Sequence, residues 1–451
     1  MSLAPGAGDA LASLARCMAE AAAESLVRIS GVVTEVSPSH ARVAGLSPFL
    51  KLGDCVSFGA DGSTHRAEVV RIDAQGASIK AFELDTLTRL CAKVTREGPL
   101  RLAPHSSWKG RVINALGVPI DGAGPLRQGE RPVQIDAAPP PAMRRARIVK
   151  PLRTGVRVLD LFTPICAGQR IGVFAGSGVG KSTLLAMLAG ARDFDAVVIA
   201  LVGERGREVR EFLDDALAGN RALAVAVVAT GDESPTMRRL APRTAMAVAE
   251  FFRDRGDSVL LIVDSMTRFA HAARDVALAA GEPAVARGYA PSVFSDLPRL
   301  LERAGPGEEG NGSITGIFSV LVDGDDHNDP VADAVRGTLD GHIVLDRAIA
   351  DEGRFPAVNV LGSISRLAQI AWTSEQHGLI LKLRGLIARF EDTRDLRLMG
   401  GYREGADPEL DQAVALVPKI YRALAQSPQS PLSRDAFREL AEALAGPSTA
   451  A

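Results

Sequence analysis

A glycine-rich octapeptide, Ala175 to Ser182, constrains the fold of this chain more than any other stretch. It reads AGSGVGKS and lies between an apolar run at residues 170–175 and a helical pattern at residues 181–191. A strand, a tight loop and a helix in this order are typical of phosphate-binding loops, because glycines let successive backbone N–H groups converge on phosphate oxygens. The helix N-terminus adds partial positive charge. The pattern predicts an α/β domain that binds a nucleotide.

The positions of this loop have separate expected roles. Lys181 places a positive charge on the β- and γ-phosphates, and the Ser182 hydroxyl ligates Mg²⁺. Ala175 replaces the first glycine of the strict motif, a position that only ends the strand. The residues expected to hold ATP are Gly176, Ser177, Gly178, Val179, Gly180, Lys181, Ser182 and Thr183.

Apolar runs alternate with helical patterns after about residue 150. The runs cover residues 170–175, 196–202, 222–230, 258–264, 313–322 and 342–345, and helical patterns lie at 181–191 and 207–217. Parallel strands need crossover connections that are usually helices, and those helices bury both faces of the sheet. The alternation therefore predicts a parallel sheet covered on both faces.

Two acidic residues lie at the ends of these expected strands. Asp264 closes the run at 258–264, where a carboxylate can hold Mg²⁺ through its water shell. Glu204 follows the run at 196–202, at the carboxyl edge of the sheet, where ligands of open α/β sheets bind. Hydrolysis needs a group that orients the attacking water, and Glu204 is the candidate. Arg205 contacts the γ-phosphate or orients Glu204.

The flanking regions have other periodicities. Residues 1–27 carry apolar residues at helical spacing, which predicts a helix packed either on the chain itself or on a partner or membrane. Residues 28–100 contain short β-rich runs separated by Gly and Asp, which predict a small barrel or sandwich. After about residue 370 the pattern is helical, notably at 407–425 and 433–444.

These changes of period divide the chain into expected domains. We expect an N-terminal segment at 1–27, a β-domain at 28–100, an ATPase domain at 101–369 and a helical domain at 370–451. Residues 101–150, with a proline-rich stretch at 137–142, are interpreted as a linker into the ATPase domain.

Composition argues against several function classes. The chain has 52 basic and 54 acidic residues, a net charge of -2 and 4% aromatics, which gives no basis for binding nucleic acid by charge or stacking. The four cysteines, Cys17, Cys55, Cys91 and Cys166, are scattered, so we interpret them as buried apolar residues rather than zinc ligands. No charge-free stretch could span a bilayer, and no secretory signal begins the chain. We therefore expect a cytoplasmic protein with at most peripheral membrane contact.

Four motifs resemble the rotary ATP synthase family. They are the phosphate loop, GERGREV at 203–209, GRVINALGVPID at 110–121 and SISR at 363–366. Three more stretches are similar to its protein-export branch, and in particular to flagellum-specific ATPases: GYAPSVF at 288–294, ERAGPG at 302–307 and DGHIVLDR at 340–347. The resemblance runs from about residue 29 to the C-terminal helices. It implies a multidomain fold with an N-terminal β-barrel, a central α/β RecA-like domain with a parallel sheet, and a C-terminal α-helical domain.

The resemblance also implies roles for residues. Glu204 matches the catalytic glutamate that positions water, and Asp264 the aspartate of the Mg²⁺ site. Arg205 and Arg268 match arginines near the γ-phosphate and the metal-site carboxylates. Phe355 falls where the family often places a tyrosine against adenine, and a phenylalanine keeps the stacking face. Simple core packing of Phe355 is the alternative.

Arg366 has the largest implication for assembly. In heteromeric relatives this arginine comes from the non-catalytic neighbour and reaches across the interface. Here one chain carries both Glu204 and Arg366. A homo-hexameric ring would then make every interface catalytic. A structural ion pair of Arg366 is the alternative.

By resemblance, the expected function is MgATP hydrolysis by this ring, energising type III export of flagellar proteins. The alternative is the ATPase of a virulence-type secretion system, which shares the catalytic residues; a synthase subunit and a ring-shaped RNA translocase are more distant rivals. The implied partners are a regulatory stator-like protein at the N-terminus, a central coiled-coil stalk, export-gate proteins of the inner membrane and chaperone–substrate complexes. Asp325 and Asp326, in the acidic run at 323–330, either contact the stalk or form a solvated loop.

Overall fold

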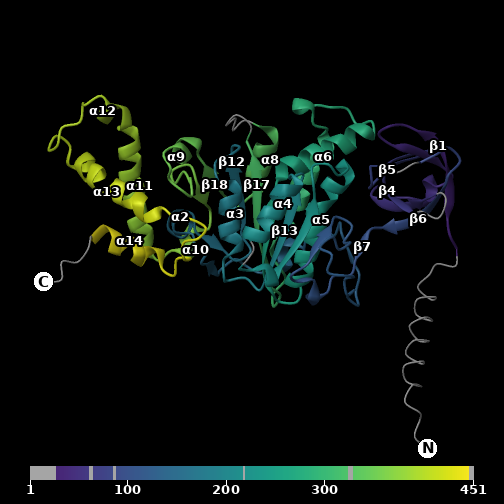
Figure 1. The fold of residues 1–451 in the computed structure, drawn as a ribbon, viewed down its shortest axis with the longest axis horizontal. Coiled ribbons are helices and arrows are strands. Elements are labelled where there is room, and N and C mark those ends of the chain that lie inside the picture. The colour runs from purple at the N-terminus through teal and green to yellow at the C-terminus, as the bar shows by residue number, and fades with distance from the viewer. Residues whose placement is uncertain (1–26, 60–63, 85–87, 217–218, 323–328, 446–451) are drawn as a thin grey trace, which may run out of the picture. The chain divides into compact units, whose positions relative to one another are not determined.

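The computed structural model describes residues 27–59, 64–84, 88–216, 219–322 and 329–445 (Figure 1). The chain divides into two compact units at the boundary between Pro99 and Leu100. The helix expected at residues 1–27, apart from Val27, and the acidic pair Asp325 and Asp326 lie outside the described residues.

The first unit contains a closed barrel of six antiparallel strands in the order β1-β2-β5-β4-β3-β6. Alternate side chains point inward, and a buried cluster that includes Val33, Val43, Val56, Val69 and Val94 fills the interior. The prediction of a small β-domain is confirmed, and of the two predicted architectures, barrel or sandwich, the barrel is the observed one. The strands are β1 (Ser30–Val36), β2 (Ala41–Ala44), β3 (Asp54–Phe58), β4 (His65–Asp73), β5 (Gly76–Ala81) and β6 (Lys93–Pro99).

The second unit is built on a mainly parallel sheet in the order β19-β18-β12-β17-β15-β13-β14-β8. The runs expected at 170–175, 196–202 and 258–264 are strands with these same bounds, because a strand buried on both faces is apolar along its whole length. The strands are β8 (Val112–Asn114), β12 (Arg170–Ala175), β13 (Ala196–Val202), β14 (Ala224–Ala229), β15 (Ser258–Asp264), β17 (Ser313–Leu321), β18 (Gly341–Leu345) and β19 (Ile364–Ser365), with the short β16 (Gly305–Pro306) paired to β17.

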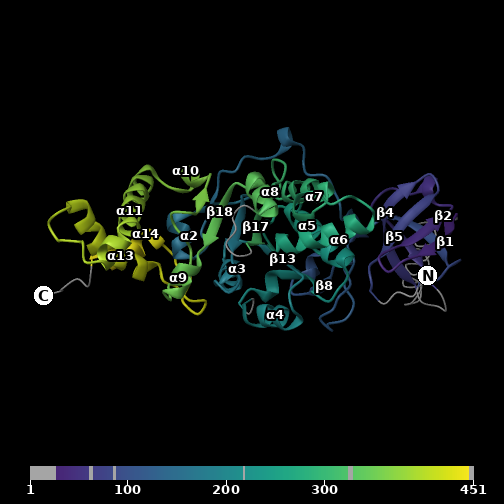
Figure 2. The same cartoon turned by 90° about the horizontal axis from the view of Figure 1, so that it is seen from above.

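Helices cover both faces of this sheet, as predicted. Figure 2 shows α3 and α4 on one side and α5, α7 and α8 on the other. The helix expected at 207–217 begins as α4 and continues as a π-helical turn, Phe212–Ala216. The bounds are α3 (Lys181–Ala189), α4 (Gly206–Glu211), α5 (Pro235–Arg253), α6 (Met266–Ala279), α7 (Pro291–Leu301) and α8 (Pro330–Thr338).

Residues 101–150 contribute to the second unit directly. Strand β8 pairs in parallel with β14 and extends the main sheet by one edge strand. A separate two-stranded sheet joins β7 (Arg101–Leu102) to β9 (Val133–Gln134), and another joins β10 (Pro151–Leu152) to β11 (Ile165–Cys166). The segment interpreted as a linker is therefore partly integrated into the sheet.

The C-terminal region is helical, as expected. Helix α11 (Ser374–Asp392) begins with a capping box between Thr373 and Gln376, and α13 (Pro408–Leu424) begins after an Asp407 N-cap. The inner faces of these helices join the same apolar core as α2. The remaining helices are α2 (Arg157–Phe162), α9 (Arg347–Asp351), α10 (Ala368–Ala371), α12 (Arg394–Leu398) and α14 (Ala436–Ala445).

Two further expectations concern the whole chain. Among the described helices, none combines the length and the apolar character needed to cross a membrane. Cys55 and Cys166 are buried and free, as expected, but Cys91 is free and exposed, so the prediction of burial is wrong for that residue.

Candidate nucleotide-hydrolysing site

The phosphate loop connects β12 to α3 and has a backbone that requires glycine. Gly178 and Gly180 have φ values of +79° and +92°, a region that other residues rarely adopt. Val179 between them is buried and fixes the loop to the core. Gly180 is the N-cap of α3 and offers no capping side chain. The first N–H groups of α3 therefore remain available to a phosphate.

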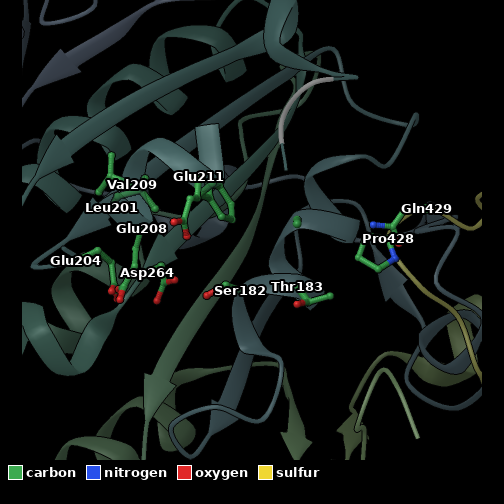
Figure 3. A pocket seen from close by; sticks show the side chains of 12 residues that line it. Ser182, Thr183, Leu201, Glu204, Glu208, Val209, Glu211, Asp264, Pro428 and Gln429 are labelled. Atoms are coloured by element: carbon green, nitrogen blue, oxygen red, sulfur yellow. The ribbon is translucent and has the colours of Figure 1, made fainter. Parts of the chain in front are cut away.

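The neighbouring strands bring the expected catalytic residues to this loop. Strands β13 and β15 are adjacent, with Leu201 opposite Asp264, so Glu204 and Asp264 emerge at the same edge of the sheet. Lys181 Nζ is hydrogen-bonded to Asp264 and lies 4.0 Å from Glu204. Ser182 lines the same pocket. Figure 3 shows the carboxylates on one side of the pocket, with Ser182 beside them.

Each carboxylate has its own surroundings. Asp264 is buried and also accepts a hydrogen bond of 2.6 Å from Ser319 Oγ. Burial and the negative charge of Asp264 raise the pKa of Glu204, and the charges of Lys181 and Arg268 offset part of this effect. A carboxylate with a raised pKa is a stronger base, which suits a group that takes a proton from water.

The two arginines near Glu204 are arranged differently from each other. The side chain of Arg205 is 71% exposed and forms an ion pair of 2.9 Å with Glu208. Arg268 instead lies 3.3 Å from Glu204 and donates a hydrogen bond to the carbonyl of Gly203. Arg268 is therefore the arginine that contacts Glu204 in this structure, and the guanidinium of Arg205 contacts Glu208 instead.

Phe355 lies beside the phosphate loop and not in the core. It is 43% exposed, so the alternative of core packing does not apply. A Cβ atom built on Gly180 would stand 3.6 Å from its ring. The Phe355 carbonyl also accepts a hydrogen bond of 2.8 Å from the backbone N–H of Gln426. The ring thus borders the loop at a place where a base can stack on it.

The residues on one side of the pocket are among those that the sequence-based set lacked. Pro428 and Gln429 line the pocket on the side away from the carboxylates (Figure 3). Gln426 anchors this segment, because its side chain donates to Gly155 O at 2.9 Å and accepts from Arg157 N at 3.0 Å. No local pattern in residues 426–431 points to a ligand, so only the tertiary structure reveals them.

Arg366 does not belong to the pocket of its own chain. It is exposed, and its side chain makes no hydrogen bond or ion pair within the described part of the chain. Its backbone N–H donates a hydrogen bond of 2.9 Å to Asp340 O, which fixes the position of its backbone. The alternative of an intrachain ion pair is therefore not observed among the described residues.

The residues present fit a magnesium ion bound together with a triphosphate. Among the described residues no group of three or more His, Cys, Asp or Glu side chains could hold a metal by itself. The Ser182 hydroxyl and the Asp264 carboxylate, however, line one pocket. Mg²⁺ usually takes one or two protein oxygens and completes its shell with water and phosphate oxygens. The donor set matches that preference.

Comparison with known proteins agrees with this geometry. Residues 155–365 match the ATP synthase alpha/beta family, nucleotide-binding domain, and residues 372–442 match the T3SS EscN ATPase C-terminal domain. A flagellum-specific ATP synthase of Agrobacterium fabrum is 56% identical over 97% of this chain and 92% of its own. A type 3 secretion system ATPase of Xanthomonas euvesicatoria is 43% identical over 90% and 92%.

A solved structure shares the fold. It is the assembled ATPase EscN in complex with its central stalk EscO, from the type III secretion system of enteropathogenic E. coli. It has a TM-score of 0.84 and 37% identity, covering 92% of this chain and all of the EscN chain. This chain is thus an ATPase that belongs to the flagellum-specific branch of the ATP synthase alpha/beta family.

Proposed function

We propose that this chain hydrolyses MgATP at sites shared between neighbouring copies of a homo-hexameric ring, and that hydrolysis energises export of flagellar proteins. The observation that carries the shared site is the placement of Arg366. It lies outside the pocket that holds Glu204, and its guanidinium has no partner among the described residues. A neighbouring copy can therefore receive it.

Binding begins with competition for Lys181. Its ammonium is paired with Asp264 in this structure, and a triphosphate in the loop offers it a stronger set of negative charges. When Lys181 moves to the β- and γ-phosphates, the Asp264 carboxylate is released, and Asp264 together with the Ser182 hydroxyl would hold Mg²⁺. A bound Mg²⁺ would supply positive charge at the phosphate oxygens.

Glu204 then orients the attacking water and accepts its proton. Arg268 keeps the Glu204 carboxylate in place through their 3.3 Å contact. Charge spreads over the oxygens of the transferring phosphoryl group, and Arg366 of the neighbour neutralises part of it. On the other side of the pocket, Phe355, Pro428 and Gln429 form the surface that receives adenine.

The larger assembly follows from the family and from the chain's own parts. We propose the domains at 1–27, 28–100, 101–369 and 370–451, with the helical domain moving as the nucleotide changes. A coiled-coil stalk would contact the run at 323–330, and a stator-like partner the first 27 residues. Export-gate membrane proteins and chaperone–substrate complexes would engage the ring at the cytoplasmic side of the inner membrane. Higher identity to the flagellar relative favours this role over a virulence-type one, and a motility defect on deletion tests it.

A subunit-mixing experiment tests the shared site. Rings of Glu204→Gln alone or Arg366→Ala alone should hydrolyse ATP at least about 10³-fold more slowly than the unmodified chain. Mixed one to one, they should recover up to about a quarter of the full rate, because an Arg366→Ala copy beside a Glu204→Gln copy restores one complete site. The steady-state ATPase rate against mixing ratio is the measurement.

A matched control uses an exposed arginine away from the pocket. Arg438, on α14, is paired with Glu442 and 77% exposed, and Arg438→Ala should leave the rate unchanged in every mixture. Nucleotide binding to Arg366→Ala should survive. If the two inactive variants gave no activity at any ratio, although mass spectrometry showed mixed rings, both residues would belong to one chain's site and the proposal would be wrong.

A further inference from the structure

An arginine at the start of α9 contacts the backbone of the phosphate loop. Arg347 Nη2 donates a hydrogen bond of 2.8 Å to the carbonyl of Ser177. Strands β12 and β18 are adjacent and parallel, with Ala175 opposite Leu345, so the segments that follow them leave the sheet side by side. The contact therefore follows from the sheet order and not from proximity in sequence.

The position of this hydrogen bond matters because of peptide geometry. In a planar trans peptide the C=O and the N–H point in opposite directions. The Ser177–Gly178 peptide is trans, and its C=O points to Arg347. The N–H of Gly178 is consequently directed to the other side of that peptide, away from Arg347. A loop that holds phosphate depends on inward N–H groups.

Arg347 is itself held at a defined place. Asp346 is the N-cap of α9 and accepts from Ala348 N at 2.9 Å. The same carboxylate accepts from Asn359 Nδ2 at 3.1 Å. Phe355, at the end of the segment that α9 begins, lies against Gly180. The segment 346–355 thus contacts the phosphate loop at two points, Ser177 and Gly180.

We infer that Arg347 is a positioning residue for phosphate binding: by holding the Ser177 carbonyl it keeps the Gly178 N–H aimed at the phosphates. Its role is exerted through the loop backbone, since its hydrogen bond is to the loop and not to the pocket interior. The inference rests on the proposed nucleotide site. Without Arg347 the Ser177–Gly178 peptide can rotate, because glycine permits many backbone conformations.

The test is the affinity for MgADP, measured by equilibrium dialysis, which requires no hydrolysis. Arg347→Ala should weaken MgADP binding about tenfold, as expected for loss of one charge-assisted hydrogen bond. Arg347→Lys should recover most of the affinity, because an ammonium can still donate to a carbonyl. Adenosine, which has no phosphate, should bind both variants and the unmodified chain equally. Arg438→Ala serves as the matched exposed-arginine control.

Each outcome has a distinct meaning. Equal MgADP affinity in Arg347→Ala and the unmodified chain would overturn the inference and leave the proposed function intact. An equal loss of adenosine and MgADP binding would also overturn it, since it would indicate general disruption of the pocket. Failure of the unmodified chain to bind MgADP would instead contradict the proposed function. If Arg347→Ala does not fold, Arg347→Gln, which keeps one side-chain donor group, replaces it. Arg347→Gln should weaken MgADP binding by less than Arg347→Ala would, and it should leave adenosine binding unchanged.

Discussion

Glu204 and Asp264 are two carboxylates that line one pocket, and the proposed mechanism gives them different tasks because their surroundings differ. Asp264 is buried, paired with Lys181 and hydrogen-bonded to Ser319, so it sits among donors that hold negative charge near a metal. Glu204 has a raised pKa because it is buried and faces the charge of Asp264. In the proposed mechanism Glu204 therefore acts on the attacking water, and Asp264 on the metal.

A further carboxylate, Asp160 on α2, is hydrogen-bonded to the segment that precedes this helix. It accepts hydrogen bonds from Thr154 N and Thr154 Oγ1 at 2.9 and 2.7 Å and from Gly155 N at 3.0 Å. Burial nevertheless raises the pKa of Asp160 to about 6 from 3.8. Between these values the native state binds a proton that the unfolded state does not, so the free energy of unfolding decreases as pH rises through this window.

We therefore predict a pH-dependent difference between the unmodified chain and Asp160→Asn. From pH 4 to pH 6.5 the stability of the unmodified chain relative to the variant should fall by about 2–3 kcal/mol. Denaturant melts of both proteins at each pH are the measurement, and Asp214→Asn, an exposed carboxylate, is the control. Parallel pH curves for the unmodified chain and Asp160→Asn would show that Asp160 titrates alike in both states.

At the scale of elements, the segment that carries Phe355 connects the nucleotide site to the C-terminal helices. The guanidinium of Arg354 lies 3.9 Å from the ring centroid of Tyr421 on α13. Glu352 accepts from Arg354 at 2.8 Å and pairs with Arg394 of α12 at 2.9 Å. Tyr421 in turn donates a 2.5 Å hydrogen bond to Glu391 of α11. These contacts join helices α11, α12 and α13 to the segment that carries Phe355.

This connection predicts non-additive effects on nucleotide binding. Arg354→Met and Tyr421→Leu should each weaken MgADP binding about fivefold, because a cation–π contact of about 1 kcal/mol no longer holds Phe355 in place. The double variant should be no weaker than either single one, since both remove the same contact. Fluorescence titration with a labelled ADP measures this, with Lys382→Met on α11 as control. If the loss of MgADP affinity in the double variant equalled the product of the two single losses, the two residues would act independently.

At the scale of the whole molecule, the chain carries on separate surfaces the two sets of residues that the proposed shared site would join. Ser182, Glu204 and Asp264 line the pocket and Lys181 pairs with Asp264, while Arg366 follows β19 outside that pocket. In the proposed scheme a single copy provides the base, and a neighbouring copy must supply the Arg366 guanidinium. Activity should depend on association of copies.

The corresponding prediction concerns protein concentration. The ATPase rate per chain should rise cooperatively as the concentration increases and the ring assembles, in parallel with the sedimentation coefficient. Arg366→Ala should assemble in the same range and remain slow at every concentration, because its interfaces lack the arginine. Dilute, monomeric chains that hydrolyse ATP at the full rate would contradict the shared site.

The amino-acid sequence alone determined the parts of this protein that depend on local chemistry. Strands buried on both faces are continuous apolar runs, so β12, β13 and β15 were predicted with their observed bounds. The phosphate loop was predicted because its glycines, Lys181 and Ser182 are consecutive. Glu204 and Asp264 were found because strand ends in a parallel sheet share one edge.

Only the tertiary structure decided which distant residues meet. Three contacts of the site join residues from separate elements. Glu204 is paired with Arg268 and not with Arg205, and Arg347 is hydrogen-bonded to Ser177. Pro428 and Gln429 line the pocket opposite the carboxylates. The pairing of β8 with β14 also joins distant residues, and it makes part of the expected linker an edge strand of the sheet. These contacts follow from strand order and helix packing, which no short stretch of sequence encodes, because a side chain's partner depends on where the fold brings the rest of the chain.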